Sequence, residues 1–528
     1  MPVDVVPRLE PESDGRPRRS SRRVWTFRIA AVLLGIAPFL LFEGVCALCG
    51  WGRPDVHDDP FVGFSAVRPL FVLNDNQSRY EIPKARQTHF RPASFAAEKP
   101  GNGFRIFCLG GSTVQGRPFA VETSFTTWLE IALRSADPSR QWEVVNCGGV
   151  SYASYRLVPI LEEVLRHDPD LIIIYTGHNE FLEARNFEHI EQRGPVVNEA
   201  LRALSHVRTF TLLREGYLQL RGRSSSDPPE SRPILPTEVE ALLDYRGGLR
   251  DYHHDEAWRS GVVAQFRFNL RRMIDLAQDA GVDVVLVNPV SNFADSPPFK
   301  SEHDPTLSQQ QQERWAACTV DARRYLRGKD RDLRKAIKLF DQACQIDPMH
   351  ATGFYNLAKC YEAAGQFDQA REAYLQAKEV DVCPLRILQP MNDIVLEIAE
   401  DTGTPLVDAQ RLFEGLSEGG IVGRRWLVDH VHPSIEGHQR LADALAENLI
   451  ALEIAEPAPD WQEIKQRQYR AHFEALDDHY FAKGVERRRA VAGWAAGRAR
   501  RLRSGESGRS RTPESESTNS SPASTKGP

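Results

Sequence analysis

The chain has 528 residues, of which 41% are hydrophobic and 26% are charged. This length allows about three domains, and this composition excludes a chain that is disordered throughout. The net charge of −6 excludes a globally basic nucleic-acid-binding protein, and the eight scattered cysteines do not form the pattern of a disulfide scaffold or a zinc site.

The N-terminal end predicts a membrane anchor. Residues 1–23 contain six arginines and predict a basic cytoplasmic tail, and residues 29–51 then carry Glu43 as their single charge. About 20 apolar residues span a bilayer core. Because the arginines precede it, residues 24–51 are predicted to be an uncleaved, single-pass signal anchor that places the rest of the chain in the periplasm. A cleaved signal peptide and a twin-arginine signal at Arg22-Arg23 remain alternatives.

An alternation of short apolar runs and longer helical stretches follows. Each run is rich in Ile and Val and too short for a helix, as is typical of strands buried on both faces. The runs lie at 104–109, 142–146, 170–175, 283–288 and 404–408, with helices expected at 124–134, 154–166 and 265–279. We therefore expect an α/β domain with a three-layer, flavodoxin-like parallel sheet, in two parts at 52–304 and 385–455. Ligands of such sheets bind at the carboxyl ends of the strands.

Residues 305–384, between these parts, form an insertion that reads as helices. Residues 351–382 resemble a tetratricopeptide repeat, because small and apolar residues stand where paired helices pack: Phe354, Leu357, Ala358, Tyr361, Ala370, Tyr374 and Ala377. Ala336, Phe340, Ala343 and Pro348 match the second half of a preceding repeat. A generic helical hairpin is the alternative. We expect the insertion to pack on the α/β domain, where it either covers the active site or presents a groove to a protein partner; a distal position is the alternative.

The C-terminal end changes character once more. Residues 456–504 are predicted to form a charged helix over 460–503, and residues 505–528 a disordered tail of Ser, Gly, Pro, Thr and Glu. The arginine-rich end of this helix could contact anionic lipid or nucleic acid. A solvated face is the preferred interpretation.

Residues suited to ester chemistry stand after the predicted strands. Ser112 follows two glycines that permit a sharp turn, and no G-x-G-x-x-G or Gly-Lys-Ser/Thr pattern favours a nucleotide loop there. Asp429 and His432 stand three apart, so the carboxylate could orient the imidazole. Asn179, after the third strand, could donate its amide to an oxyanion. His430 beside His432 raises the alternative of a metal, but no further pair completes a site, and we expect neither a metal nor a cofactor.

In this order the motifs resemble the SGNH/GDSL hydrolase family, with a glycine block at 146–151 between the serine and asparagine motifs. The resemblance implies that Ser112 is the nucleophile, His432 the general base and Asp429 its orienting acid. It also implies an oxyanion hole formed by the backbone N–H groups of Ser112 and Ser151 and by the amide of Asn179. Ser151 stands where the family has a glycine. Membrane-anchored members with an inserted tetratricopeptide region are the most similar.

The resemblance implies a membrane-anchored, extracytoplasmic serine esterase or O-acyltransferase. Its substrate would be an acylated carbohydrate or lipid, which passes its acyl group to Ser112. The alternative is a non-catalytic scaffold that binds partners through the helical repeats. Loss of the nucleophile, base or acid would favour the scaffold, and all three residues are present. Nucleic acid is not expected as a partner.

Overall fold

The computed structural model describes residues 21–49, 51–52, 59, 61–187, 204, 207–220, 233–244, 247–327, 331–489 and 491. The chain divides into two compact units, one made of residues 1–60 and 188–232 and the other of residues 61–187 and 233–528. Most of the predicted tail at 1–23, and all of the tail predicted at 505–528, lie outside the described residues.

The part of the first unit that the structure describes contains the helices α1 (Ser21–Cys49) and α7 (Arg208–Leu220). The Glu43 carboxylate of α1 accepts hydrogen bonds from the backbone N–H groups of Arg208 and Thr209, at 2.7 and 2.8 Å, and thereby caps the start of α7. The anchor predicted at 24–51 coincides with α1. Among the helices that the structure describes, however, none combines the length and the apolar character needed to cross a membrane.

The second unit is built on a five-stranded sheet. Its strands are β5 (Gly103–Gly110), β6 (Gln141–Gly148), β7 (Leu171–Tyr175), β9 (Asp283–Asn288) and β10 (Leu406–Asp408). All pairs are parallel, in the order β10-β9-β7-β5-β6. Read from β6, this is the 2-1-3-4-5 order of flavodoxin-like sheets. The mixed α/β fold with a parallel sheet is thus confirmed, and β5 lies at the point where the strand order reverses.

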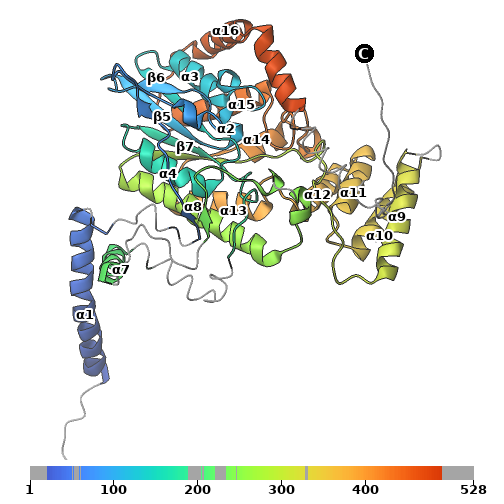
Figure 1. Cartoon of the computed structure of the whole chain (residues 1–528), viewed down its shortest axis with the longest axis horizontal. Coiled ribbons are helices and arrows are strands. Elements are labelled where there is room, and N and C mark those ends of the chain that lie inside the picture. Colours follow the sequence, from blue (N-terminus) through green and yellow to red (C-terminus); the bar gives the residue numbers. More distant parts are fainter. Residues whose placement is uncertain are drawn as a thin grey trace, which may run out of the picture. The chain divides into compact units, whose positions relative to one another are not determined.

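Helices cover both faces of this sheet (Figure 1). One layer consists of α3 (Phe125–Ala136), α15 (Ile435–Ala451) and α16 (Trp461–Glu474), and the other of α4 (Ser154–Val164), α8 (Glu256–Asp279) and α13 (Gln389–Thr402). Helix α8 begins nine residues earlier than the predicted start at 265, because Asp255 caps it by accepting the Trp258 N–H. Apolar side chains of both layers are fully buried against the strands.

Shorter elements complete the second unit. Two small sheets lie beside the main one, a parallel pair of β1 (Gly63–Phe64) with β8 (Ile234–Leu235) and an antiparallel sheet of β2 (Val72–Leu73), β3 (Arg79–Glu81) and β4 (Ser94–Ala96). Two short α-helices are α2 (Ser112–Gln115) and α14 (Ala409–Gly415). The 3₁₀ turns are Lys84–Arg86, Val121–Thr123, Leu242–Asp244, Gly248–Asp251 and Glu418–Gly420.

The insertion folds into two helical hairpins. Its helices are α9 (Gln309–Arg327), α10 (Leu333–Ile346), α11 (Ala351–Ala363) and α12 (Phe367–Glu379). Buried residues of the hairpins, Phe340, Leu357 and Tyr374 among them, belong to the same apolar cluster as residues of the sheet. The Tyr355 hydroxyl also donates to the Ala294 carbonyl at 2.7 Å. The insertion therefore packs against the α/β domain.

The C-terminal helix is shorter than predicted. Instead of one helix over 460–503, the structure has α16 and a second helical stretch at 478–489, separated by a break at residues 475–477. Asp477 accepts the backbone N–H of Tyr480 at 2.7 Å, and this cap starts a new helix in a new direction. A further departure is that α16 is not simply solvated, since the Tyr469 hydroxyl donates to the Trp128 carbonyl of α3 at 3.0 Å.

Candidate active site

Ser112 occupies the first position of α2, with Gly111 alone between it and the end of strand β5, and is 8% exposed. Two glycines make this turn possible. A Cβ atom at Gly110 would lie 2.1 Å from the Tyr175 carbonyl oxygen, and one at Gly111 would lie 2.5 Å from Asn179 Nδ2. Since real Cβ contacts are essentially never under 3.0 Å, only glycine fits at Gly110, where the contact is with backbone, and a larger residue at Gly111 would have to displace the Asn179 side chain. The end of β5 can thus pass close to β7 immediately before Ser112.

His432 and Asp429 lie beside Ser112 with the spacing of a hydrogen-bonded triad. His432 Nε2 is 2.7 Å from Ser112 Oγ, and His432 Nδ1 is 2.7 Å from Asp429 Oδ2. An ionised carboxylate only accepts hydrogen bonds, so the imidazole proton belongs on Nδ1. Nε2 is then left to accept the serine hydroxyl. The structure brings together the three residues that the sequence singled out for this role.

The Asp429 carboxylate is held in its charged form. Burial alone would raise the pKa of this group, but the nearby charge of His432 and the hydrogen bonds from His432 outweigh that effect and hold the pKa well below its ordinary value. Asp429 Oδ1 also accepts the backbone N–H groups of Val431 and His432, at 3.0 and 2.9 Å. These bonds orient the carboxylate toward the imidazole ring.

The loop that carries Asp429 and His432 is fastened by Asn292, which follows β9. Asn292 Nδ2 donates to the Asp429 carbonyl at 3.0 Å, and the Asn292 N–H donates to the His430 carbonyl at 3.0 Å. Arg386, just after the insertion, donates to the Asn292 carbonyl at 2.9 Å. Sequence reasoning missed both residues. The one available signal was the position of Asn292 shortly after the carboxyl end of a predicted strand.

Three donors surround the nucleophile turn. The backbone N–H groups of Ser112 and Ser151 make no hydrogen bond within the part of the chain that the structure describes. Asn179 Nδ2 uses one of its two hydrogens on the Tyr152 carbonyl at 2.9 Å, which leaves the other for a ligand. A Cβ atom at Gly111 would lie 2.5 Å from Asn179 Nδ2 and 3.4 Å from the Tyr152 carbonyl oxygen, so the turn before Ser112, the Asn179 amide and the residue after Ser151 lie close together. This is the arrangement that an oxyanion requires.

Ser151 adopts a backbone conformation that is more usual for glycine. Its φ of 64° lies in the left-handed region, which glycine enters freely and serine enters at a cost. Asn146, which begins the glycine block, has a different function: its Nδ2 donates to the Val114 carbonyl at 2.6 Å, and its Oδ1 accepts the Gly148 N–H at 3.0 Å. Asn146 thus holds α2 in place and takes no part in the oxyanion hole.

Two buried histidines that we did not assign lie beside the triad. His178 Nδ1 accepts the Ile387 N–H at 3.2 Å, so its proton belongs on Nε2, which has no partner within the described ranges. Burial lowers the pKa of His178 well below its ordinary value, and the neighbouring rings of His430 and His432 disfavour its protonation further. Burial likewise lowers the pKa of His430 to about 4, although Asp429 opposes the shift. Both rings are therefore neutral near pH 7.

His430 does not complete a metal site. Its Nδ1 lies 3.6 Å from Asp429 Oδ1, and its ring packs edge-on against Phe299 at 5.0 Å. No group of three or more His, Cys, Asp or Glu side chains suited to a metal ion occurs among the residues placed by the structure.

Comparison with known proteins gives two kinds of match. Residues 329–382 match the tetratricopeptide repeat family, which confirms the predicted repeat. Among solved structures, an acetylxylan esterase from Geobacillus stearothermophilus matches at 14% identity and a TM-score of 0.29, over 67% of this chain and 96% of that chain. A protein of Desulfitobacterium hafniense DCB-2, named as lipolytic and of the G-D-S-L family, matches at 10% identity and a TM-score of 0.28, over 65% and 99%. Curated proteins give no match. At these TM-scores neither structure assigns an activity to the chain.

Proposed function

We propose that the protein is a serine esterase or O-acyltransferase that acts through an acyl-enzyme on Ser112. The observation that carries this proposal is the continuous hydrogen-bonded series of Ser112 Oγ, His432 and Asp429, with both separations at 2.7 Å. A nucleophile, a base and an orienting acid in this relation suffice to activate a hydroxyl near neutral pH. Unpartnered donors beside the nucleophile add the electrostatic part of catalysis.

The reaction proceeds in two halves. Ser112 Oγ attacks the ester carbonyl while His432 Nε2 takes its proton, and the negative charge on the carbonyl oxygen is held by the N–H groups of Ser112 and Ser151 and by Asn179. The C–O bond to the alcohol then breaks, and His432 returns the proton to the departing oxygen. Water or another hydroxyl next attacks the acyl-enzyme, gives its proton to His432 and carries off the acyl group as Ser112 regains its hydrogen.

The active-site test is covalent labelling. A fluorophosphonate probe should modify the wild-type protein at Ser112, and p-nitrophenyl acetate should be hydrolysed. Both signals should vanish in Ser112→Ala and persist in Ser65→Ala, a variant of an exposed serine remote in sequence from the triad. Absence of labelling and of hydrolysis in the folded wild-type protein would sink the enzyme proposal and favour a non-catalytic scaffold that binds partners through residues 305–384.

We further propose an extracytoplasmic location, with an acylated carbohydrate or lipid as substrate. The sequence supports attachment to the membrane, since 22 of the 23 residues at 29–51 are uncharged and arginines precede them. Exposed leucines of α1 such as Leu34 and Leu48, at 77% and 90% exposure, are consistent with an apolar surrounding. A phosphatase reporter fused after residue 60 should be active only if the fusion point is outside the cytoplasm. A second fusion at the same point would carry a reporter that is active only in the cytoplasm. Activity of that reporter would overturn the proposal.

A further inference from the structure

Three arginines, Arg91, Arg117 and Arg487, gather beside the nucleophile turn. Arg117 directly follows α2 and its closing glycine, and its backbone N–H donates to the Ser112 carbonyl at 3.1 Å. Its Nε lies 3.4 Å from Gln115 Oε1, while Gln115 Nε2 donates to the His89 carbonyl at 2.7 Å. The Gln115 side chain thus joins the Arg117 guanidinium to the segment that contains Arg91.

That segment borders the oxyanion residues. The His89 carbonyl, which accepts from Gln115, also accepts the Val150 N–H at 2.8 Å, one residue before Ser151. Arg91 follows two positions later and is half-buried. Its Nε is buried and has no hydrogen-bond partner within the described part of the chain. A buried guanidinium nitrogen left without an acceptor is costly and indicates a missing partner.

Arg487 reaches the same place from the C-terminal helical stretch at 478–489. Its Nη1 donates to the Phe119 carbonyl at 2.7 Å, two residues after Arg117. The stretch is seated firmly, because the Tyr480 hydroxyl lies 2.8 Å from Thr123 Oγ1, and a Cβ at Gly484 would lie only 2.1 Å from the Phe119 ring. Arg487 therefore has a defined position next to Arg117.

The positive charge of these arginines is not neutralised internally. Within the ranges that the structure places, none of the three forms an ion pair with a carboxylate. Burial lowers the pKa of Arg117, and the charges of Arg91 and Arg487 lower it further. Burial and the charge of Arg487 lower the pKa of Arg91, which Glu122 opposes. Like charges held together and partly removed from water are unfavourable unless an anion joins them.

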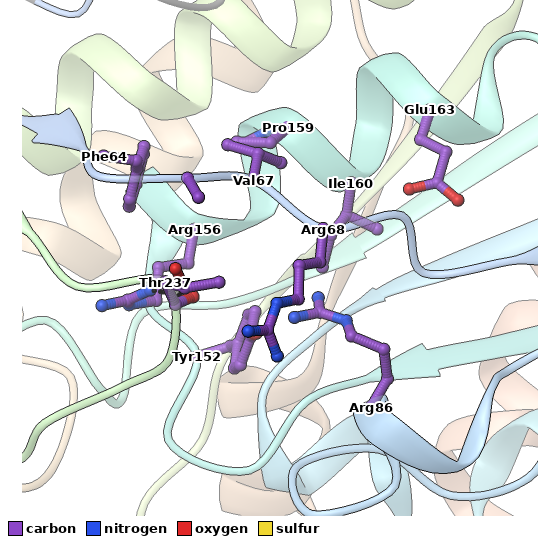
Figure 2. Close-up of a pocket in the computed structure, with 11 residues that line it drawn as sticks. Phe64, Val67, Arg68, Arg86, Tyr152, Arg156, Pro159, Ile160, Glu163 and Thr237 are labelled. Carbon is purple, nitrogen blue, oxygen red and sulfur yellow. Dashed lines mark hydrogen bonds between the residues drawn. The ribbon is translucent and has the colours of Figure 1, made fainter.

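A second arginine-rich place shows the contrast. Figure 2 shows a pocket lined by Arg68, Arg86 and Arg156. There Arg86 pairs with Glu238 at 2.8 Å and Arg156 with Glu183 at 2.6 Å, while Arg68 is exposed to water. The fold thus neutralises its buried arginines in that pocket, whereas the cluster beside Ser112 lacks such partners.

We propose that Arg91, Arg117 and Arg487 bind an anionic group of the acylated substrate, so that the enzyme prefers an acidic glycan over a neutral one. This inference rests on the proposed function. Guanidinium groups suit carboxylates, sulfates and phosphates because they donate in pairs from one plane. Because the cluster lies beside the nucleophile and the oxyanion residues, we assign the anion to the same molecule as the ester. The carboxylate of a uronic acid sugar near the acylated position meets this requirement.

The test compares two acetylated polysaccharides with equal degrees of acetylation, anionic polygalacturonate and neutral xylan. The wild-type protein should have the higher kcat/KM on polygalacturonate, and added salt should reduce that preference. In Arg117→Gln and Arg487→Gln, the ratio of the two kcat/KM values should fall about tenfold or more, mainly through KM on polygalacturonate. Arg489→Gln, an exposed residue on the same helical stretch, is the matched control and should change neither value.

A binding experiment separates this inference from the proposed function. Trigalacturonate should bind Ser112→Ala in calorimetry and bind at least tenfold more weakly when Arg487→Gln is added. Loss of this binding in the double variant supports the anion site even if no ester is hydrolysed. Equal kcat/KM values on both polymers, or an affinity for trigalacturonate that Arg487→Gln leaves unchanged, would overturn the inference and leave the esterase proposal intact. Phosphatidylglycerol vesicles and sulfated or phosphorylated sugars can be tested as competitors of acetylated polygalacturonate. If any of them competes and trigalacturonate does not, the assignment to a uronate is overturned.

Discussion

Gly111 and Asn179 lie so close together that a methyl group on Gly111 would sit 2.5 Å from Asn179 Nδ2. A larger residue before Ser112 would therefore have to displace the Asn179 amide, although the φ of −87° at Gly111 is open to any residue. The glycine therefore protects the position of the amide and does not supply a special backbone conformation.

Gly111→Ala should therefore impair catalysis more than folding. The added methyl must push Asn179 aside, and loss of one oxyanion donor costs about 10²–10³ in turnover. We expect such a fall in kcat on p-nitrophenyl acetate with a melting temperature close to that of the wild-type protein. Gly415→Ala, where a Cβ meets nothing within 4 Å, is the control and should keep full activity. Full activity in Gly111→Ala would show that Asn179 takes no part.

Ser151 should act through its backbone alone. Ser151→Gly keeps the N–H and relaxes a left-handed φ of 64°, so turnover should stay near the wild-type value. Ser151→Val should lower turnover, because a β-branched residue is strongly disfavoured at positive φ and will turn the N–H away. Steady-state kinetics of both variants decide the matter. A large loss of activity in Ser151→Gly would assign a function to the hydroxyl instead.

Asp429→Asn should be nearly inactive. An amide at this position can donate to His432 Nδ1, which favours the tautomer with the proton on Nε2 and removes the acceptor for Ser112. We expect kcat to fall by about 10³–10⁴ and the rate of fluorophosphonate labelling to fall with it. The folded state of the variant is checked by its circular dichroism spectrum. Labelling at the wild-type rate would contradict the role given to the carboxylate.

The stability of the protein should fall as the pH is lowered from about 6.5 toward 4. Burial lowers the pKa of His350 and His430 to about 4 and that of His438 to about 3. The unfolded chain therefore binds more protons than the folded one in this window, which costs on the order of 3 kcal/mol for each histidine. Urea unfolding at several pH values measures the slope, and His350→Gln should make it shallower. A stability that is flat across this range would refute the prediction.

The isolated insertion should not fold. Residues 305–384 form two hairpins whose buried side chains share one apolar cluster with the sheet, and repeat arrays need about three units to stand alone. The fragment should show little helix by circular dichroism and no cooperative melt. A sharp thermal transition would show that it is an independent module.

Much of this architecture could be predicted because the signals were local. Apolar runs located all five strands of the main sheet, and the glycines before Ser112 and the spacing of Asp429 and His432 located the triad. What was missed depends on distant contacts. The break before residue 478 comes from a cap at Asp477, in a stretch whose charge pattern alone continues as a helix. Asn292 and Arg386 donate to carbonyl groups that lie far away in sequence, and only the position of Asn292 after a predicted strand pointed to either residue.

The catalytic pair also sets a condition on how the protein is made. Ser112 and His432 are 320 positions apart, and the helical insertion and strand β10 are synthesised between them. A nascent chain that has completed strands β5, β6, β7 and β9 contains Ser112 but not yet His432. The tetratricopeptide hairpins are synthesised before that residue, so under the proposed mechanism a chain that stops short of residue 432 lacks its base and should not react with esters.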